Sequence, residues 1–344
     1  MSRITANVDS IPIRAFWLDE VDEIKEIVNG LVHRTYLVTV SGKRYILQRV
    51  NTYVFKEADK VNDNIQQVSS YVSNDPSFTL KVPKLKKTVD RRLSYQGDEG
   101  DYWRCFYFIE GVTRTSLSDN KEAFEVAKAF GQFSAALASL PPESLHFTIQ
   151  GFHDPDERQI QFQRALAEGN SNRIAICQES INSILDQSWI ATKIKNLNLP
   201  LKVAHNDPKL SNVLFDQKGG ICAVIDLDTV MPGSPLHDFG DLVRSMAASV
   251  PEDHADLPAV RIDRKIYTAL KEGFLEGAGH TLTESEKLHL NLGAAYIIYE
   301  QGLRFLADYI QGDIYYRIDY DDHNLIRAKN QIALLHSFLE AVKA

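Results

Sequence analysis

The chain has 344 residues, 44% of them hydrophobic, which is enough to bury a large core and most often gives two domains or lobes. Its 38 Lys and Arg against 46 Asp and Glu give a net charge of −8, which argues against nucleic acid as a partner. Residues 1–19 lack an apolar core of signal-peptide length, and no uninterrupted apolar run of about 18 residues occurs, so we expect a cytoplasmic protein with no membrane association.

Patterns of apolar residues change near residue 111. Before it, alternating or apolar runs predict strands at 26–28, 35–40, 44–50, 80–88 and 102–109, with one helix at 57–72. After it, helical periods dominate, at 120–140, 172–194, 262–276, 284–310 and 323–342. This order predicts an α+β fold with an N-terminal nucleotide-binding lobe, 1–110, and a C-terminal catalytic and substrate-binding lobe, 111–344. The hinge is expected at Phe108-Ile109-Glu110-Gly111, and the cleft between the lobes is the expected site.

The segment from His205 to Asn212 has the spacing H-x-D-x-x-x-x-N, in which the Asp accepts the proton of a substrate hydroxyl and the Asn reaches a metal ion. Asp207 would be that base, and Lys209 suits a phosphate contact. The following residues, 213–225, predict a β-hairpin that returns Asp226 to the neighbourhood of Asn212. Oxygen ligands at these two positions predict a magnesium site, so phosphoryl transfer is the leading hypothesis. The alternative is a polar surface loop with coincidental spacing.

The nucleotide side departs from the protein-kinase pattern. A lone glycine, Gly30, stands between two expected strands, where a loop could cover phosphates with backbone N–H groups, although a single glycine there is more often structural. The strand at 45–50 offers Gln48 where a lysine would be expected, and strand alternation places Arg49 on the other face. The phosphate-binding side chain therefore stays open, and backbone groups of the hinge are expected to contact adenine. The expected nucleotide-contacting residues are Gly30, Val32, His33, Thr35, Gln48 and Glu110.

The catalytic loop together with Ile225-Asp226 resembles the aminoglycoside phosphotransferase and choline kinase superfamily. Longer strings, at residues 45–56, 224–232, 237–241 and 300–306, are similar to its N-acetylhexosamine 1-kinase branch. The resemblance implies a bilobal protein-kinase-like fold, with a small β-rich N-terminal lobe and a larger, mostly helical C-terminal lobe. It also implies ATP and Mg²⁺ as cofactors, and transfer of phosphate to the anomeric hydroxyl of GlcNAc or GalNAc, which gives the sugar 1-phosphate.

Further residues are assigned by the same resemblance. Arg304 is expected to hydrogen-bond sugar hydroxyls beside a wall formed by Tyr315 or Tyr316, or else to be a solvated helix residue. The expectation for Asp228 comes from its spacing instead. It lies two residues from Asp226 and would face the same side of an extended segment, so it is expected to contact metal or substrate, with a structural turn as the alternative. Two later acids would brace the catalytic loop, and the second would also cap a following helix; they are Asp238 and Asp241.

Two other functions remain open. The acceptor could be another small hydroxylated metabolite or an antibiotic, of choline, homoserine or aminoglycoside type. The chain could also be a nucleotide-binding pseudokinase, although every catalytic acid is present. We expect a monomer or a weak homodimer acting on a small sugar.

Overall fold

The computed structural model describes residues 11–27, 32–97 and 100–343. Contacts within the chain divide it into two compact units. Unit 1 runs through Thr113 and also includes Ser139–Gln150 and Asn212–Pro232, whereas unit 2 comprises Arg114–Ala138, Gly151–Ser211 and Gly233–Ala344. This division differs from the expected linear ranges, 1–110 and 111–344, because two later segments pack into unit 1. The α+β fold, with strands gathered in the N-terminal region and helices in the C-terminal region, is confirmed.

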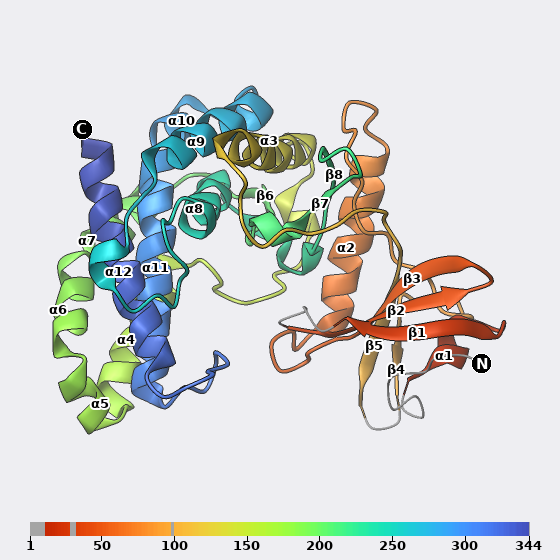
Figure 1. Ribbon diagram of the computed structural model, residues 1–344, viewed down its shortest axis with the longest axis horizontal. Helices are drawn as coiled ribbons and strands as arrows, with labels where there is room; N and C mark the ends of the chain where they lie inside the picture. Colours follow the sequence, from red (N-terminus) through yellow and green to blue (C-terminus); the bar gives the residue numbers. More distant parts are fainter. Residues whose placement is uncertain (1–10, 28–31, 98–99, 344) are drawn as a thin grey trace. The chain divides into compact units, whose positions relative to one another are not determined.

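Unit 1 is built on a five-stranded antiparallel sheet in the order β1-β2-β3-β5-β4 (Figure 1). Its strands are β1 (Val21–Ile27), β2 (Arg34–Val40), β3 (Lys43–Arg49), β4 (Ser94–Gln96) and β5 (Tyr102–Tyr107). Every second side chain of β2 is buried, namely Tyr36, Val38 and Val40. This is the alternation expected of a strand in a sheet with one apolar face. They belong to a core cluster that also contains Trp17, Leu47, Trp103 and Cys105.

The remaining elements of unit 1 join three stretches of chain. They are α1 (Ile13–Phe16), α2 (Ala58–Ser73), the 3₁₀ helix η2 (Pro142–Ser144), the hairpin β7 (Val213–Phe215) and β8 (Ile221–Val224), the 3₁₀ helix η4 (Leu227–Thr229) and β9 (Met231–Gly233), whose last residue belongs to unit 2. Buried Asn64 of α2 explains why the later stretches belong here. Its side-chain amide donates to the carbonyl oxygens of His146, at 2.8 Å, and Val230, at 2.9 Å. One side chain thus ties both segments to α2.

Gly111 marks a close approach between the end of the first stretch and the hairpin. Its φ of 157° disfavours other residues, and a Cβ there would lie 2.9 Å from Cβ of Leu214. The next residue, Val112, bridges Phe215, which fixes the hairpin against the chain. The expected hinge glycine is therefore needed for packing as well as for its backbone conformation.

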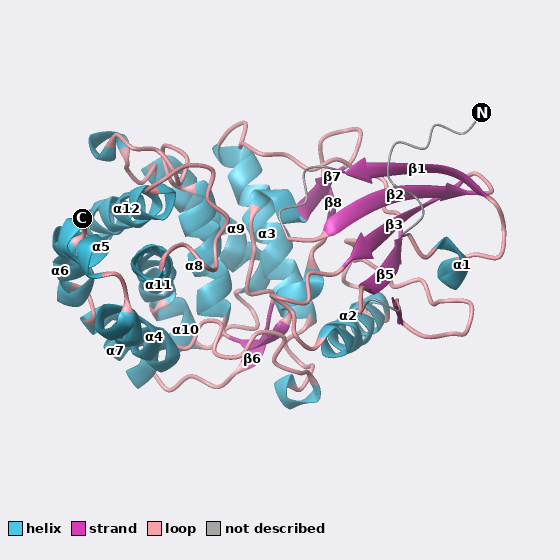
Figure 2. Ribbon diagram, turned by 90° about the horizontal axis from the view of Figure 1, so that it is seen from below, coloured by secondary structure: helices cyan, strands magenta, loops and turns pink. Residues whose placement is uncertain are grey.

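Unit 2 is mostly helical. Its elements are α3 (Asn120–Ala136), α4 (Pro155–Glu168), α5 (Ser171–Ile176), α6 (Gln178–Asp186), α7 (Trp189–Asn196), β6 (Lys202–Ala204), the 3₁₀ helix η3 (Leu210–Asn212), whose last residue belongs to unit 1, α8 (Pro235–Met246), the 3₁₀ helix η5 (Leu257–Ala259), α9 (Arg264–Ala278), α10 (Glu284–Leu288), α11 (Leu290–Gln311) and α12 (His323–Lys343). Helix α11 is the centre of the unit and packs against α12, α8 and α4 (Figure 2). Buried residues occur on all sides of α11, as expected for a helix surrounded by others.

Helices α3 and α9 pack with their backbones close together. A Cβ at Gly273 would lie 2.1 Å from the carbonyl oxygen of Phe124, and one at Gly277 would lie 2.4 Å from that of Lys128. Only glycine allows this distance between the helices, so the two residues, spaced four apart, create the contact surface.

Several expected elements differ from the structure. Residues 80–88 form only isolated bridges, at Lys81 and Leu85, because Pro83 lacks the N–H that a ladder needs. The expected helix at 172–194 is three short helices, and the one at 284–310 ends and restarts at His289. Three α-helices were missed, the short α1 and the longer α4 and α8. Both α4 and α8 begin with a capping residue followed by proline, at Asp154-Pro155 and Ser234-Pro235. Among the described residues, no helix combines the length and apolar character needed to cross a membrane.

Candidate functional site

A buried carboxylate binds the backbone of the loop that contains Asp207. Asp238 of α8 accepts the backbone N–H groups of His205, at 3.0 Å, and Asn206, at 2.7 Å. Asn206 itself has a φ of 62°, a left-handed conformation that Asn tolerates better than most residues. The bracing role expected of Asp238 is thus present in the geometry, and it holds the strained residue immediately before Asp207.

Burial raises the pKa of Asp238 to about 7, even though the two backbone N–H groups favour its ionised form. The second acid, Asp241, does not cap a helix, because it lies inside α8. Its carboxylate instead pairs with Arg244, at 2.6 Å. Sequence spacing alone gave Asp241 a capping role because the start of α8 at Ser234-Pro235 was missed.

His205 is fully buried and acts structurally. Its ring meets those of Phe130 and Phe133 of α3 edge-on, with centroids 5.2 and 5.8 Å apart. The imidazole ring is therefore packed between two aromatic side chains of α3.

Asp207 and Lys209 form an ion pair in unit 2, with Nζ 2.7 Å from Oδ2. Both side chains are partly open to solvent, at 26% for Asp207 and 32% for Lys209. The expected base is therefore accessible, and the cation expected to contact phosphate is the one that pairs with it.

Asn212 and Asp226 lie in unit 1, where the hairpin brings their chain segments together. The backbone N–H of Ile225 donates to the carbonyl oxygen of Asn212 at 2.9 Å. Asp226 is exposed and has a φ of 62°, whereas Asn212 is buried. One exposed carboxylate next to one amide fits Mg²⁺, which is usually bound by one or two carboxylates completed by substrate phosphates and waters. The described residues contain no cluster of three or more His, Cys, Asp or Glu suited to a metal ion.

Asp228 belongs to a buried polar network rather than standing open beside Asp226. Its Oδ2 lies 2.7 Å from Nη2 of Arg104 and 2.5 Å from Nε2 of His33. The Arg104 and Asp228 side chains are only 2% and 4% exposed. Burial alone would raise the pKa of Asp228, but Arg104 and His33 together hold it well below its ordinary value. The network thus keeps a buried carboxylate ionised.

The same network crosses three strands of the sheet. Gln48 pairs with Arg104 across β3 and β5, and with Thr35 across β2 and β3. Its Oε1 accepts from Nη2 of Arg104 at 2.8 Å, and its Nε2 donates to the Thr35 hydroxyl at 3.2 Å. Arg49 lies on the other face, as strand alternation predicts, and pairs with Asp101. Gln48, at the position where a lysine was expected, is therefore bound to Arg104 of the neighbouring strand.

The other expected nucleotide residues are placed differently. His33 is held by the network on one side and by the backbone N–H of Asn51 on the other, at 3.0 Å. Val32 is 46% exposed, and the Glu110 side chain forms an exposed ion pair with Arg44. Gly30 lies outside the described residues. A nucleotide contact of Glu110 would thus come from its backbone.

Arg304 of α11 is enclosed by aromatic rings in unit 2. Its guanidinium lies 5.2 Å from the ring centre of Phe152, 5.7 Å from that of Tyr315 and 5.6 Å from that of Tyr316. The side chain is 11% exposed, so the alternative of a solvated helix residue is wrong. Burial raises the pKa of Tyr316 to about 12 despite the nearby cation, so this ring carries a neutral hydroxyl. The structure brings together three of the four residues expected to bind the substrate, Arg304, Tyr315 and Tyr316.

Sequence reasoning missed three charged residues that these interactions depend on. Arg104 binds Asp228, and His153 with Glu300 holds the carbonyl oxygen of Asn206. A signal was present for Arg104, because a single cation in the otherwise apolar strand Tyr102–Tyr107 must find a buried partner. His153 and Glu300 had no comparable signal, since both precede or follow the motif by many residues.

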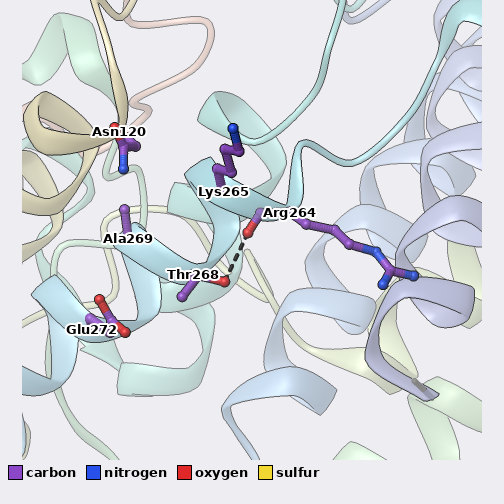
Figure 3. A pocket seen from close by; sticks show the side chains of 6 residues that line it. All are labelled: Asn120, Arg264, Lys265, Thr268, Ala269 and Glu272. Carbon is purple, nitrogen blue, oxygen red and sulfur yellow. Dashed lines mark hydrogen bonds between the residues drawn. The ribbon is translucent and has the colours of Figure 1, made fainter.

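One hollow on unit 2 lies elsewhere. A pocket of about 370 Å³ between the start of α3 and α9 is lined by Asn120, Arg264, Lys265, Thr268, Ala269 and Glu272 (Figure 3). The Thr268 hydroxyl donates to the carbonyl oxygen of Arg264, whose side chain extends away from the others. None of the expected site residues lines this pocket.

Solved structures with the same fold include several kinases. A spectinomycin phosphotransferase in complex with ADP and spectinomycin is 14% identical to this chain, with a TM-score of 0.63. The match covers 96% of this chain and 97% of the phosphotransferase. A microcompartment-associated aminopropanol kinase is 16% identical over 95% of this chain and 96% of its own, with a TM-score of 0.66. A choline kinase from Cryptosporidium parvum is 15% identical over 93% of this chain and 89% of its own, with a TM-score of 0.54. Identities this low show the shared fold alone.

Sequence similarity adds the family. Residues 23–271 match the phosphotransferase enzyme family, abbreviated APH. The matched region contains the catalytic loop, the hairpin with Asp226 and the network around Asp228, so the resemblance to the aminoglycoside phosphotransferase and choline kinase superfamily is confirmed. Because the match covers well over half of the chain, this protein belongs to the phosphotransferase enzyme family.

Proposed function

We propose that this phosphotransferase is an ATP-dependent kinase that phosphorylates the anomeric hydroxyl of an N-acetylhexosamine, GlcNAc or GalNAc. The observation that supports phosphoryl transfer most directly is the braced loop, in which Asp238 accepts the backbone N–H groups of His205 and Asn206, the two residues before Asp207. The sugar itself is supported by the similarity of residues 224–232 and 300–306 to N-acetylhexosamine 1-kinases.

In the proposed reaction, the anomeric oxygen forms a bond to the γ-phosphorus of ATP. The bond between that phosphorus and the β,γ-bridging oxygen breaks, and ADP leaves with the electron pair. Asp207 accepts the hydroxyl proton as transfer proceeds, and an anomeric hydroxyl suits this step because it is more acidic than other sugar hydroxyls. The products are the sugar 1-phosphate and ADP.

Asn212 and Asp226 would hold Mg²⁺, which neutralises charge on the nucleotide phosphates when bound. Lys209 stands 2.7 Å from Asp207 and can offset the negative charge of the base before substrate enters. A lysine on a flexible stem can also turn toward a phosphate oxygen, so it suits both the resting and the reacting states.

The surroundings of Arg304 favour a neutral acceptor. Its guanidinium offers rigid N–H donors for hydroxyl or amide oxygens, and the rings of Tyr315 and Tyr316 offer apolar faces for a sugar ring. A cationic acceptor of choline or aminoglycoside type would be repelled by the same guanidinium. A neutral N-acetylated sugar therefore fits this part of unit 2 better.

The proposal is tested by measuring ADP release and product formation with Mg-ATP across GlcNAc, GalNAc, glucose, galactose, choline, homoserine and an aminoglycoside. We expect turnover with the N-acetylated sugars, and phosphorus NMR should place the new phosphate on C1. The Asp207→Asn variant should lose at least about 100-fold in kcat, whereas Asp186→Asn, an exposed acid on α6, should keep it.

If the protein preferred choline or the aminoglycoside, the proposed sugar acceptor would be wrong and the acceptor would be cationic. Retention of most of the kcat by Asp207→Asn would remove Asp207 as the base. Nucleotide binding without turnover on any acceptor would instead indicate a pseudokinase.

A further inference from the structure

His153, in the loop before α4, has acceptors at both of its ring nitrogens. Nδ1 lies 2.8 Å from Oε2 of Glu300, and Nε2 lies 3.1 Å from the backbone carbonyl oxygen of Asn206. A carbonyl oxygen and an ionised carboxylate can only accept, so each ring nitrogen must carry a proton to make both hydrogen bonds. The ring is therefore an imidazolium when both contacts are made.

The surroundings support this charge. Glu300 is 2% exposed, and although burial would raise its pKa, His153 leads the cations that lower it to about 2. Burial would lower the pKa of His153, but the Glu300 carboxylate outweighs it and raises that pKa above its ordinary value. The charged or titratable groups that face His153 from the surrounding elements are Glu300, Arg304, Arg158, His237, Asp238 and Tyr296.

The neighbouring histidine does not share the charge. The His237 ring centre lies 5.1 Å from that of His153, and burial, followed by the charge of His153, lowers the pKa of His237 to about 3. At neutral pH one ring of the pair is therefore an imidazolium and the other is neutral. A ring nitrogen of His153 contacts the loop, at the carbonyl oxygen of Asn206.

The contact of His153 completes a clamp around Asn206. Asp238 accepts its N–H at 2.7 Å, and His153 donates to its carbonyl oxygen at 3.1 Å. Between these two points the residue keeps its left-handed φ of 62°. The clamped carbonyl belongs to the peptide that joins Asn206 to Asp207. The orientation of this peptide sets the position of the Asp207 Cα, from which the carboxylate side chain extends.

We propose that His153, held as an imidazolium by Glu300, is a positioning residue that fixes the Asn206–Asp207 peptide and releases it when the ring loses its proton as pH rises. This inference rests on the proposed role of Asp207 as the base. The release follows because a neutral imidazole cannot donate to both acceptors at once.

The first test reads the proton directly and needs no acceptor. The full chain is labelled with ¹⁵N in its histidine rings and backbone, and NMR spectra are recorded from about pH 6 to pH 10. We expect both nitrogens of His153 to be protonated at neutral pH and to lose one proton at alkaline pH. The backbone amide signal of Asp207, whose N–H belongs to the clamped peptide, should shift with the same midpoint, whereas the Asn206 amide also reports Asp238, which accepts its N–H. Glu300→Gln should move the His153 midpoint at least about one unit lower.

The second test uses GlcNAc with Mg-ATP as the probe. The His153→Gln variant keeps an N–H donor but cannot carry the charge, and we expect its kcat to fall about 10- to 100-fold while KM for ATP changes by less than about twofold. In the unmodified protein, kcat should decline at alkaline pH, and Glu300→Gln should move that decline lower. His280→Gln, an exposed histidine, serves as the control.

The two tests separate this inference from the proposed function. A single protonated ring nitrogen at neutral pH, or an Asp207 amide that does not follow the His153 midpoint, would overturn the positioning role whatever the substrate is. Full kcat in His153→Gln would do the same. Failure of Asp207→Asn to reduce activity, with the NMR result intact, would instead remove the base.

Discussion

Replacing Arg104 by methionine should destabilise unit 1 by about 3–5 kcal/mol at neutral pH, since breaking a buried ion pair leaves an uncompensated charge. The structure sets this magnitude, because Arg104 and Asp228 are 2% and 4% exposed and 2.7 Å apart. Methionine fills a similar volume but offers no charge, so Asp228 keeps only its contact with His33. Gln48 also loses the two donors that its side-chain oxygen accepts, at 3.0 and 2.8 Å.

The loss should shrink in acid, and the sign follows from the pKa of Asp228. In the unmodified protein that pKa is lowered, so its contribution to stability is present above the ordinary carboxyl pKa of about 4 and disappears as pH falls below it. Without Arg104, burial is the main influence on the pKa of Asp228 and raises it, so the carboxylate takes up a proton more easily. The neutral form carries no uncompensated charge, so the variant is less destabilised in acid. The difference in unfolding free energy should therefore narrow between about pH 7 and pH 4.

Urea unfolding followed by tryptophan fluorescence measures this difference, because Trp17 and Trp103 both lie in the core cluster of unit 1. The matched control is Arg34→Met on β2, whose ion pair with Glu26 is 60% and 36% exposed, so we expect a change within about 0.5 kcal/mol. A loss for Arg104→Met no larger than that of the control would refute the network. A difference that stays constant with pH would refute the ionised state of Asp228.

Two further predictions concern the hinge glycine and the acceptor site. Gly111→Ala should lower the free energy of unfolding in urea by about 1–3 kcal/mol, because its Cβ would lie 2.9 Å from that of Leu214. The control Gly220→Ala, whose closest contact is at 3.6 Å, should lower it clearly less. Equal losses would contradict the close approach. Arg304→Lys should raise KM for the sugar about tenfold and leave KM for ATP unchanged, because lysine lacks the planar fork of donors. Arg317→Lys, 87% exposed, is its control, and an unchanged sugar KM for Arg304→Lys would place the acceptor elsewhere.

The sequence determined the local features on which the site is built. The spacing from His205 to Asn212 and the following hairpin signals placed Asn212 next to the Ile225-Asp226 segment, because a hairpin turn fixes which residues face each other. Strand alternation likewise separated Gln48 from Arg49, since side chains point to opposite faces in turn. These relations depend on neighbours along the chain, so one sequence suffices to derive them.

Tertiary structure alone decided which distant charges meet. Asp228 finds Arg104, which is 124 residues away in sequence, and His153 finds Glu300, which is 147 residues away. A buried charge needs a partner, and that partner can come from any element of the fold. The periodicity of the sequence therefore cannot show which two distant charges will pair. The same reason explains why the chain beyond Thr113 contributes to unit 1, since Asn64 binds two segments that only folding brings to α2.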